Sequence, residues 1–225
     1  MLVSSKNVFR ELKNGNIKKV YLSKSFKDKE IISYIKNNKI KYETSSESRM
    51  NQLSKDKHQG IILEINDYGY IDVKEFYNEK IVVILDHIED PHNFGAIIRT
   101  LEGAGVRSII IPADRSVSVN ETVIRISSGA IEYVSVSKVN NLVRVIKEFK
   151  NNGFFVYGAE SDGKNYKSIT YADKILLVMG SEGKGISHLV KESCDELISI
   201  PLKGKINSLN VSVATGIIIY HLIGE

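Results

Sequence analysis

The 225-residue sequence has a single cysteine, Cys194, so no disulfide bond can form within the chain. A chain without disulfides suits a reducing compartment, and we expect the cytoplasm. No apolar run approaches the roughly 20 residues that a membrane-spanning helix needs. Residues 1–6 also lack the apolar stretch of a secretory signal. We therefore expect no membrane association.

Two kinds of chemistry find no support in the residue spacing. The five histidines are not spaced as metal ligands relative to Cys194 or to acidic residues, so we expect no metal site. Gly158–Lys164 has the glycine spacing of a phosphate-binding Walker loop, but Asn165 stands where a Ser or Thr should hold magnesium. Glu160 and Asp162 would also repel phosphate, so we do not expect nucleotide hydrolysis.

Positive charge is concentrated in the first part of the chain. Residues 1–60 contain 14 Lys and Arg against 6 Asp and Glu, a net charge of +8, whereas residues 61–225 contain 17 against 21, a net charge of −4. A basic segment of this kind is typical of a protein that binds a polyanion. A lysine-rich solvated surface has the same composition, so charge alone leaves both interpretations open.

The order of short elements predicts a small α/β domain over residues 1–66, a linker over 67–79 that contains turn-forming residues, and a larger domain over 80–225. The first helix is expected to stop at Asn14-Gly15. The predicted helices of the first domain are Lys6–Lys13, Phe26–Asn37 and Ser46–Leu53, and its predicted strands are Lys18–Leu22, Lys41–Glu43 and Ile61–Ile65.

In the larger domain, apolar strands alternate with helices. The predicted strands are Ile81–Leu85, Ser108–Ile111, Tyr133–Val136, Phe154–Tyr157, Ile175–Val178 and Leu197–Ile200. The predicted helices are Phe94–Gly103, Asn120–Ser128, Asn140–Asn151, Ile186–Glu192 and Asn210–Leu222. Because several strands are continuous apolar runs, as in strands buried on both faces, we predict an α/β fold with a mostly parallel sheet.

Polar residues follow three of these strands at the points where the strands end. They lie in 93–99, 180–185 and 200–212. Ligands of open α/β sheets bind outside the carboxyl ends of the strands, so we expect the three segments to form one site.

The residues of each segment allow a binding role and a structural one. Asn93 can cap the helix that follows it or bind a substrate oxygen, and the planar fork of Arg99 suits a phosphate or lies on the surface. Gly180–Gly185 is a tight loop in which Glu182 favours a neutral or cationic ligand, or it is only a turn between a strand and a helix. The apolar last helix, which opens near Ser208, belongs in the core or in a subunit interface.

Together the three segments resemble the three motifs of the SpoU, or TrmH, family of RNA ribose 2′-O-methyltransferases, within the SPOUT superfamily. Asn93 and Arg99 fit the first motif, Gly180–Gly185 the second and Ile200–Ser212 the third. The first domain resembles the L30e-like RNA-binding domain of the ribosomal-RNA branch, and Lys57–Ile61 is similar to that branch too.

This resemblance implies a trefoil knot at the C-terminal end of the sheet, S-adenosylmethionine as cofactor and a homodimer. It implies that the substrate is a ribose in RNA and that DNA is not a partner. The most similar type methylates a guanosine in the peptidyl-transferase loop of 23S rRNA, either in free rRNA or in a ribosomal precursor. The implied catalytic residues are Asn93, Arg99, Glu182, Ser208 and Asn210. The implied cofactor-binding residues are Gly180, Gly183, Ile200, Leu202 and Leu209.

The family account makes Arg99 the base, but a guanidinium does not give up its proton in proteins, so we favour a phosphate clamp. Other rRNA nucleosides, tRNA and a non-catalytic RNA-binding role remain alternatives. The L30e-like domain speaks against tRNA, and the complete polar set speaks against a protein that only binds RNA.

Overall fold

The computed structural model describes residues 1–12, 16–55 and 57–224, and the chain divides into two compact units. The first unit contains Met1–Gly69 and Val119–Glu132, and the second contains Tyr70–Ser118 and Tyr133–Glu225. The sequence pattern did not indicate that residues 119–132 group with the first unit. The predicted domain boundaries at residues 66 and 79 remain a prediction.

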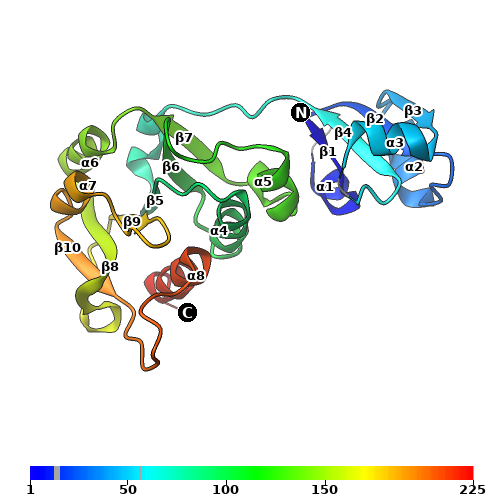
Figure 1. The fold of residues 1–225 in the computed structure, drawn as a ribbon. Helices are drawn as coiled ribbons and strands as arrows, with labels where there is room; N and C mark the ends of the chain where they lie inside the picture. Colours follow the sequence, from blue (N-terminus) through cyan, green and yellow to red (C-terminus); the bar gives the residue numbers. More distant parts are fainter. Residues whose placement is uncertain (13–15, 56, 225) are drawn as a thin grey trace. The chain divides into compact units, whose positions relative to one another are not determined.

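The first unit is built on a mixed four-stranded sheet with the order β1-β4-β2-β3. Strand β4 is antiparallel to β1 and β2, and β2 is parallel to β3. The strands are β1 (Leu2–Val3), β2 (Ile17–Ser23), β3 (Tyr42–Ser45) and β4 (Ile61–Ile65), and the helices are α1 (Lys6–Glu11), α2 (Lys29–Asn37), α3 (Glu47–Leu53) and α5 (Glu121–Ile126) (Figure 1).

Side-chain caps set where these helices begin. The predicted start of the second helix at Phe26 is wrong, because the Asp28 carboxylate accepts a hydrogen bond from the Ile31 amide and α2 starts at Lys29. In the same way, the Ser46 hydroxyl accepts from the Arg49 amide ahead of α3. The predicted stop of the first helix at Asn14-Gly15 lies outside the described residues.

The second unit contains a six-stranded sheet with the order β10-β8-β9-β5-β6-β7, in which every neighbouring pair is parallel. This confirms the predicted α/β fold with a mostly parallel sheet. The knot remains a prediction. The strands are β5 (Ile81–Asp86), β6 (Ser108–Pro112), β7 (Ser135–Val139), β8 (Phe155–Asn165), β9 (Ile175–Gly180) and β10 (Glu196–Ser199).

Helices cover both faces of this sheet because its central strands are apolar on both faces. One core cluster joins Val82 and Leu176 to Phe149 of α6 (Leu142–Asn151) and Val190 of α7 (His188–Glu192). The alternate residues of β5, such as Val83 and Leu85, are fully buried and must point to the opposite face. Helices α4 (Pro91–Gly103) and α8 (Val211–Leu222) contact each other, and α8 contacts β9 (Figure 1). The chain also contains three short 3₁₀ helices among its described residues, η2 (Val73–Asn78), η3 (Ala130–Glu132) and η4 (Tyr166–Ser168).

Strand β8 is longer than the sequence predicts. It continues through Gly158–Lys164, so this segment is not a loop of the Walker type. Its pairing with β10 holds at Gly158 and at Lys164, with a shift of register between Leu197 and Ile198. A Cβ atom at Gly163 would lie 2.6 Å from the Ile198 backbone, so glycine allows the two strands to approach at this point. In the described part of the chain, no helix has the length and apolar character to cross a membrane.

Candidate active site

The ends of two central strands bring the first two polar segments together. In the pairing of β5 with β9, Asp86 lies opposite Gly180, and each is the last residue of its strand. Helix α4 begins five residues after Asp86, whereas the loop Ser181–Gly185 follows β9 directly. This loop closes on itself, because Ser181 and Gly185 exchange backbone N–H···O bonds of 3.1 and 2.9 Å.

Asn210 joins the third segment to the other two. Its Nδ2 donates to Asn93 Oδ1 at 2.9 Å and to Glu182 Oε1 at 2.6 Å. Its Oδ1 accepts from the Ser212 amide at 3.0 Å and caps α8. One side chain therefore connects all three segments while fixing the start of the last helix, so both its orientation and that of its two partners are defined.

Asn93 is not a helix cap, and that part of the prediction is wrong. Asp90 caps α4 by accepting from the His92 amide at 2.9 Å, and Pro91 occupies the first helical turn. This backbone hydrogen bond, with further contacts to His92, holds the pKa of Asp90 below its ordinary value. Asn93 lies inside α4 and is only 8% exposed, so its amide is free to pair with Asn210.

Two of the loop glycines are fixed by close packing. A Cβ atom on Gly180 would lie 2.2 Å from the Gly185 carbonyl carbon and 2.3 Å from the Ile186 nitrogen. Gly185 has φ +66°, and a Cβ there would lie 2.5 Å from Glu160 Oε1. Gly183 has φ +79° at the exposed tip with open space around it. The loop therefore packs against its own exit at one end and leaves its tip accessible.

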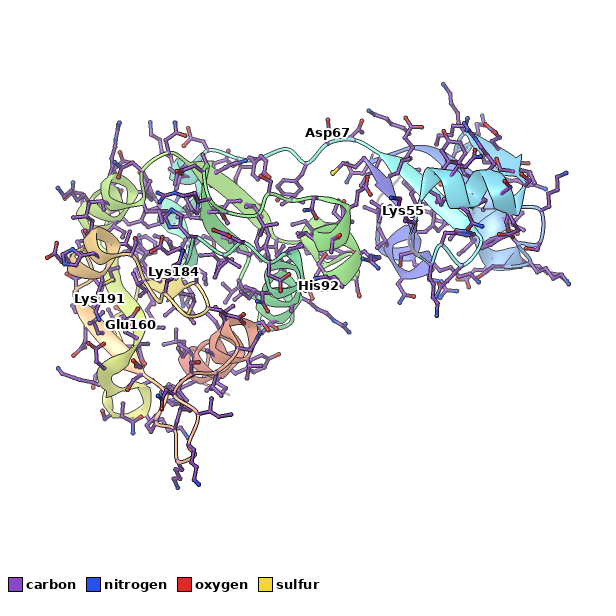
Figure 2. The ribbon with its side chains drawn as sticks, in the orientation of Figure 1. Lys55, Asp67, His92, Glu160, Lys184 and Lys191 are labelled. Carbon is purple, nitrogen blue, oxygen red and sulfur yellow. The ribbon has the colours of Figure 1, made fainter. Side chains whose placement is uncertain are left out.

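Two carboxylates that sequence reasoning missed hold the exit of this loop. Asp86 is buried, and its Oδ2 accepts from the Ser187 amide at 2.6 Å while its Oδ1 pairs with His87 Nδ1 at 2.5 Å. Glu160 Oε1 accepts from the Ile186 amide at 2.6 Å, and its other oxygen lies 3.7 Å from Lys191 Nζ (Figure 2). The sequence feature that could have indicated Asp86 is its position directly after an apolar strand.

The remaining predicted residues are near the site in sequence but are not part of this hydrogen-bond set. Arg99 is exposed on α4, and within the described residues its side chain has no hydrogen bond or ion pair. The same holds for the exposed Ser208. Leu202 and Leu209 are 39% and 37% exposed, and Ile200 is half-buried at the end of β10. The catalytic and cofactor-binding assignments of all these residues remain predictions.

Metal and thiol chemistry gain no support from the side chains. Among residues 1–12, 16–55 and 57–224, no group of three His, Cys, Asp or Glu side chains could hold a metal ion. Burial raises the pKa of the Cys194 thiol to about 12. The thiol is therefore protonated at neutral pH and is a poor nucleophile.

We expect Cys194 to resist alkylation in the native chain. At pH 8 the rise of its pKa from 9.0 to about 12 lowers the thiolate fraction by roughly a thousandfold relative to the unfolded chain. Iodoacetamide labelling followed by intact mass should therefore be very slow without denaturant and fast in guanidinium chloride. Equal labelling rates in the two conditions would contradict the partly buried placement of this thiol.

Family models match both parts of the chain. The model described as "SpoU rRNA Methylase family" matches residues 80–220, and the model described as "RNA 2'-O ribose methyltransferase substrate binding" matches residues 7–71. A protein of Staphylococcus aureus (strain COL) named "Putative TrmH family tRNA/rRNA methyltransferase" is 39% identical over 217 residues, which cover 92% of this chain and 88% of that protein.

Solved structures share the fold over nearly the whole chain. The SpoU methyltransferase AviRb of Streptomyces viridochromogenes, in complex with AdoMet, has a TM-score of 0.86 at 18% identity and covers 99% of this chain and 89% of its own. An AdoMet-bound rRNA methyltransferase of Sinorhizobium meliloti has a TM-score of 0.81 at 21% identity, with coverage of 97% and 85%.

Proposed function

This chain belongs to the SpoU/TrmH family of RNA methyltransferases, and from that premise we propose that it methylates a ribose 2′-hydroxyl of RNA with S-adenosylmethionine as the methyl donor. The observation that carries the proposal is the hydrogen-bonded set of Asn93, Glu182 and Asn210, which unites the three polar segments at the end of the sheet. A protein that only binds RNA through its first unit has no need of this set.

The residues around the site fit such a cofactor. Residues 201–209 are all exposed and belong to no helix or strand, so their backbone N–H and C=O groups are available to the edge of an adenine. Glu182 supplies a negative charge that tolerates a sulfonium. Backbone near Gly180, Gly183 and Ile200, together with Leu202 and Leu209, would hold the cofactor. When bound, S-adenosylmethionine supplies an electrophilic methyl group on a positively charged sulfur.

The chemical task left to the protein is positioning. The new bond from the ribose 2′-oxygen to the methyl carbon would form as the carbon–sulfur bond breaks, and the hydroxyl proton would pass to solvent water. Correct placement of the two reactants lowers the barrier substantially. Asn93, Glu182, Ser208 and Asn210 orient substrate and neighbouring groups. Arg99 holds the RNA phosphate next to the target ribose, because its planar fork matches two phosphate oxygens and it keeps its own proton.

Ribosomal RNA is the substrate we favour, with a guanosine in the peptidyl-transferase loop of 23S rRNA as the specific target and the cytoplasm as the compartment. The support is the net charge of +8 over residues 1–60 and the match of residues 7–71 to a substrate-binding domain model. Transfer RNA is the second candidate, since the S. aureus relative is named for both RNA types.

Two measurements test the function. Titration calorimetry of the full chain with S-adenosylmethionine should show binding without RNA. Sequencing of alkali-fragmented RNA should then show one ribose that is methylated in parental cells and unmethylated in cells that lack the gene. Loss of a tRNA methylation instead would select the second candidate, and an unchanged methylation map with no cofactor binding would reject the enzyme.

We also propose that the enzyme is a homodimer that associates through α8. Val213 and Tyr220, seven residues apart on one face of α8, are 51% and 41% exposed. Light scattering should find a dimer at micromolar concentration, and Val213→Glu should weaken it by about tenfold or more. Leu189→Glu, on the short helix α7 where Leu189 is 66% exposed, is the matched control and should leave the dimer unchanged. A parental chain that is monomeric would contradict the proposal.

A further inference from the structure

The first unit contains a pocket that the methyl-transfer site does not use. Its volume is about 420 Å³, and its lining includes Ser23, Ser25, Phe26, Lys27, Glu47 and Gln59. It thus combines a partly exposed aromatic ring, two hydroxyls, an amide and side chains of both charges. Because the lining includes the carboxylates of Glu47 and Asp28, which repel phosphate, the pocket does not suit a phosphate group alone.

A rigid turn forms one wall of this pocket. Gly60 has φ +80°, and a Cβ there would lie 2.9 Å from Ser23 Oγ and 3.0 Å from Phe26 Cδ2. The Ser23 amide donates to the Gly60 carbonyl at 2.8 Å. Any larger residue at position 60 would push into the pocket lining, so this wall of the pocket requires glycine.

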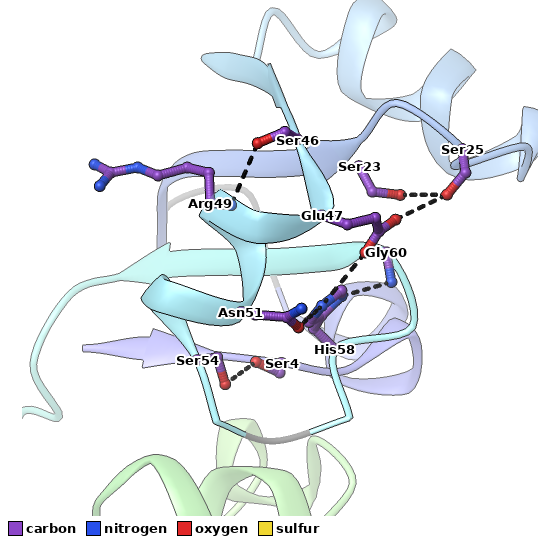
Figure 3. A network of polar contacts seen from close by, with 10 residues as sticks. All are labelled: Ser4, Ser23, Ser25, Ser46, Glu47, Arg49, Asn51, Ser54, His58 and Gly60. Atoms are coloured by element: carbon purple, nitrogen blue, oxygen red, sulfur yellow. Dashed lines mark hydrogen bonds and ion pairs between the residues drawn. The ribbon is translucent and has the colours of Figure 1, made fainter.

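The ring of His58 fixes the same turn. Its Nδ1 accepts from the Gly60 amide at 3.0 Å, so the ring proton is on Nε2 and faces Asn51 Oδ1 at 3.1 Å (Figure 3). The same Nε2 lies 3.7 Å from Glu47 Oε2, which is beyond hydrogen-bond distance. Glu47 Oε2 therefore keeps its capacity to accept hydrogen bonds from a ligand.

The position of Glu47 suits the binding of a ligand that carries N–H donors. Its side chain is 56% exposed, and Oε1 accepts a single hydrogen bond, from Ser25 Oγ at 2.9 Å (Figure 3). Each carboxylate oxygen can accept two hydrogen bonds, so further donors can bind. A carboxylate repels phosphate but accepts well from the amino and imino groups on the edge of a base.

Phe26 and two lysines complete the fit to a nucleotide. Lys6 Nζ lies over the partly exposed Phe26 ring, 5.0 Å from its centroid, so a base can stack only on the part of the ring that Lys6 leaves exposed. Lys27 is exposed on the lining, and within the described residues it has no ion pair, so it can meet the phosphate of the same nucleotide.

We propose that this pocket binds one unpaired guanosine of the RNA substrate, with the base stacked on Phe26 and its N1–H and N2–H groups donating to Glu47. Guanine presents these two donors side by side, whereas adenine offers one amino group and uracil one imino group on that edge. The inference deepens the proposed function, on which it rests, because it adds a base-reading contact in the first unit that is separate from the methylated ribose.

The test uses the full chain and three fluorescein-labelled RNA probes that form no secondary structure. The probes are a uridine nonamer and the same nonamer with a central guanosine or a central adenosine, and fluorescence anisotropy gives each Kd. The parental chain should bind the guanosine probe about tenfold more tightly than the uridine probe, as expected for one stacked and hydrogen-bonded base. The adenosine probe should fall between them.

Two variants separate the contributions of charge and stacking. Glu47→Gln keeps the size of the side chain and one acceptor oxygen but should remove the preference for guanosine over adenosine. Glu30→Gln, which removes the same charge at a side chain 81% exposed and outside the pocket, is its control and should keep the preference. Phe26→Leu keeps apolar volume but should weaken both purine probes to the level of the uridine probe, with circular dichroism as the check on folding.

The outcomes distinguish this inference from the proposed function. If the parental chain binds the three probes equally, or binds none of them at about 0.1 mM, the pocket does not read a guanosine. The same conclusion follows if Glu47→Gln keeps the full preference. Cofactor binding and methyl transfer that persist in that case leave the proposed function intact. A guanosine preference in a chain that binds no S-adenosylmethionine would support the pocket and reject the enzyme.

Discussion

Gly180→Ala is expected to abolish S-adenosylmethionine binding and to lower the free energy of unfolding by about 3 kcal/mol or more. The added methyl group would lie 2.2 Å from the Gly185 carbonyl carbon, 2.3 Å from the Ile186 nitrogen and 2.5 Å from the Gly185 oxygen. These are backbone atoms, and the Glu160 and Asp86 carboxylates hold the segment that carries them. The loop therefore cannot move aside as a flexible side chain could.

The matched control is Gly69→Ala. Gly69 lies outside the site, a Cβ there meets no atom within 4 Å, and its φ is not in the left-handed region. Calorimetry with the cofactor and a urea unfolding curve should show parental behaviour for Gly69→Ala and loss of both cofactor binding and stability for Gly180→Ala. Parental cofactor affinity in Gly180→Ala would show that the loop does not shape the cofactor site.

Arg99→Lys is expected to lower the single-turnover rate of methyl transfer by about a hundredfold with little change in cofactor affinity. Arg99 is exposed and takes no part in the hydrogen bonds of the site, so its replacement should disturb neither the fold nor the Asn210 contacts. Lysine keeps the charge but loses the planar fork that grips two phosphate oxygens. Arg144→Lys, on the exposed face of α6, is the control and should keep the parental rate.

A pH–rate profile distinguishes the clamp from a base at this position. A clamp predicts a reduced rate with a profile of unchanged shape in Arg99→Lys. If Arg99 instead acts as the base, the basic limb of the parental pH–rate profile should disappear in the variant. A parental rate in Arg99→Lys would remove both roles and leave Arg99 as a surface residue of α4.

The sequence predicted the second sheet well because burial on both faces leaves a clear record in the residues. Ile81–Leu85 and Ile175–Val178 are apolar throughout, and both form central strands. The second half of β8 leaves no such record, since Glu160-Ser161-Asp162-Gly163-Lys164 has the composition of a loop. This part of β8 meets β10 in register only from Lys164, after a shift of register, and local pattern reveals neither the shift nor a partner about 30 residues further along the chain.

The site was predictable as a set of segments but not as a set of contacts. The three segments do meet, yet the position of Asn93 depends on competition with Asp90 for the helix cap, and Pro91 favours Asp90 by fixing the first turn. Asp86 was missed because its partner is a backbone amide 101 residues away. Contacts of side chains with distant backbone leave no periodicity and no spacing in the sequence.

The bridge made by Asn210 also fixes the order in which the site can be assembled. Its two partners lie 117 and 28 residues earlier in the chain, so neither contact can form until α8 has been synthesised and has docked on α4. Contacts that close such long loops form late in folding. If the first unit binds RNA as proposed, a nascent chain would be able to engage RNA before its last helix is in place. We then expect methyl transfer to arise only with that helix, and cofactor binding to report completed folding.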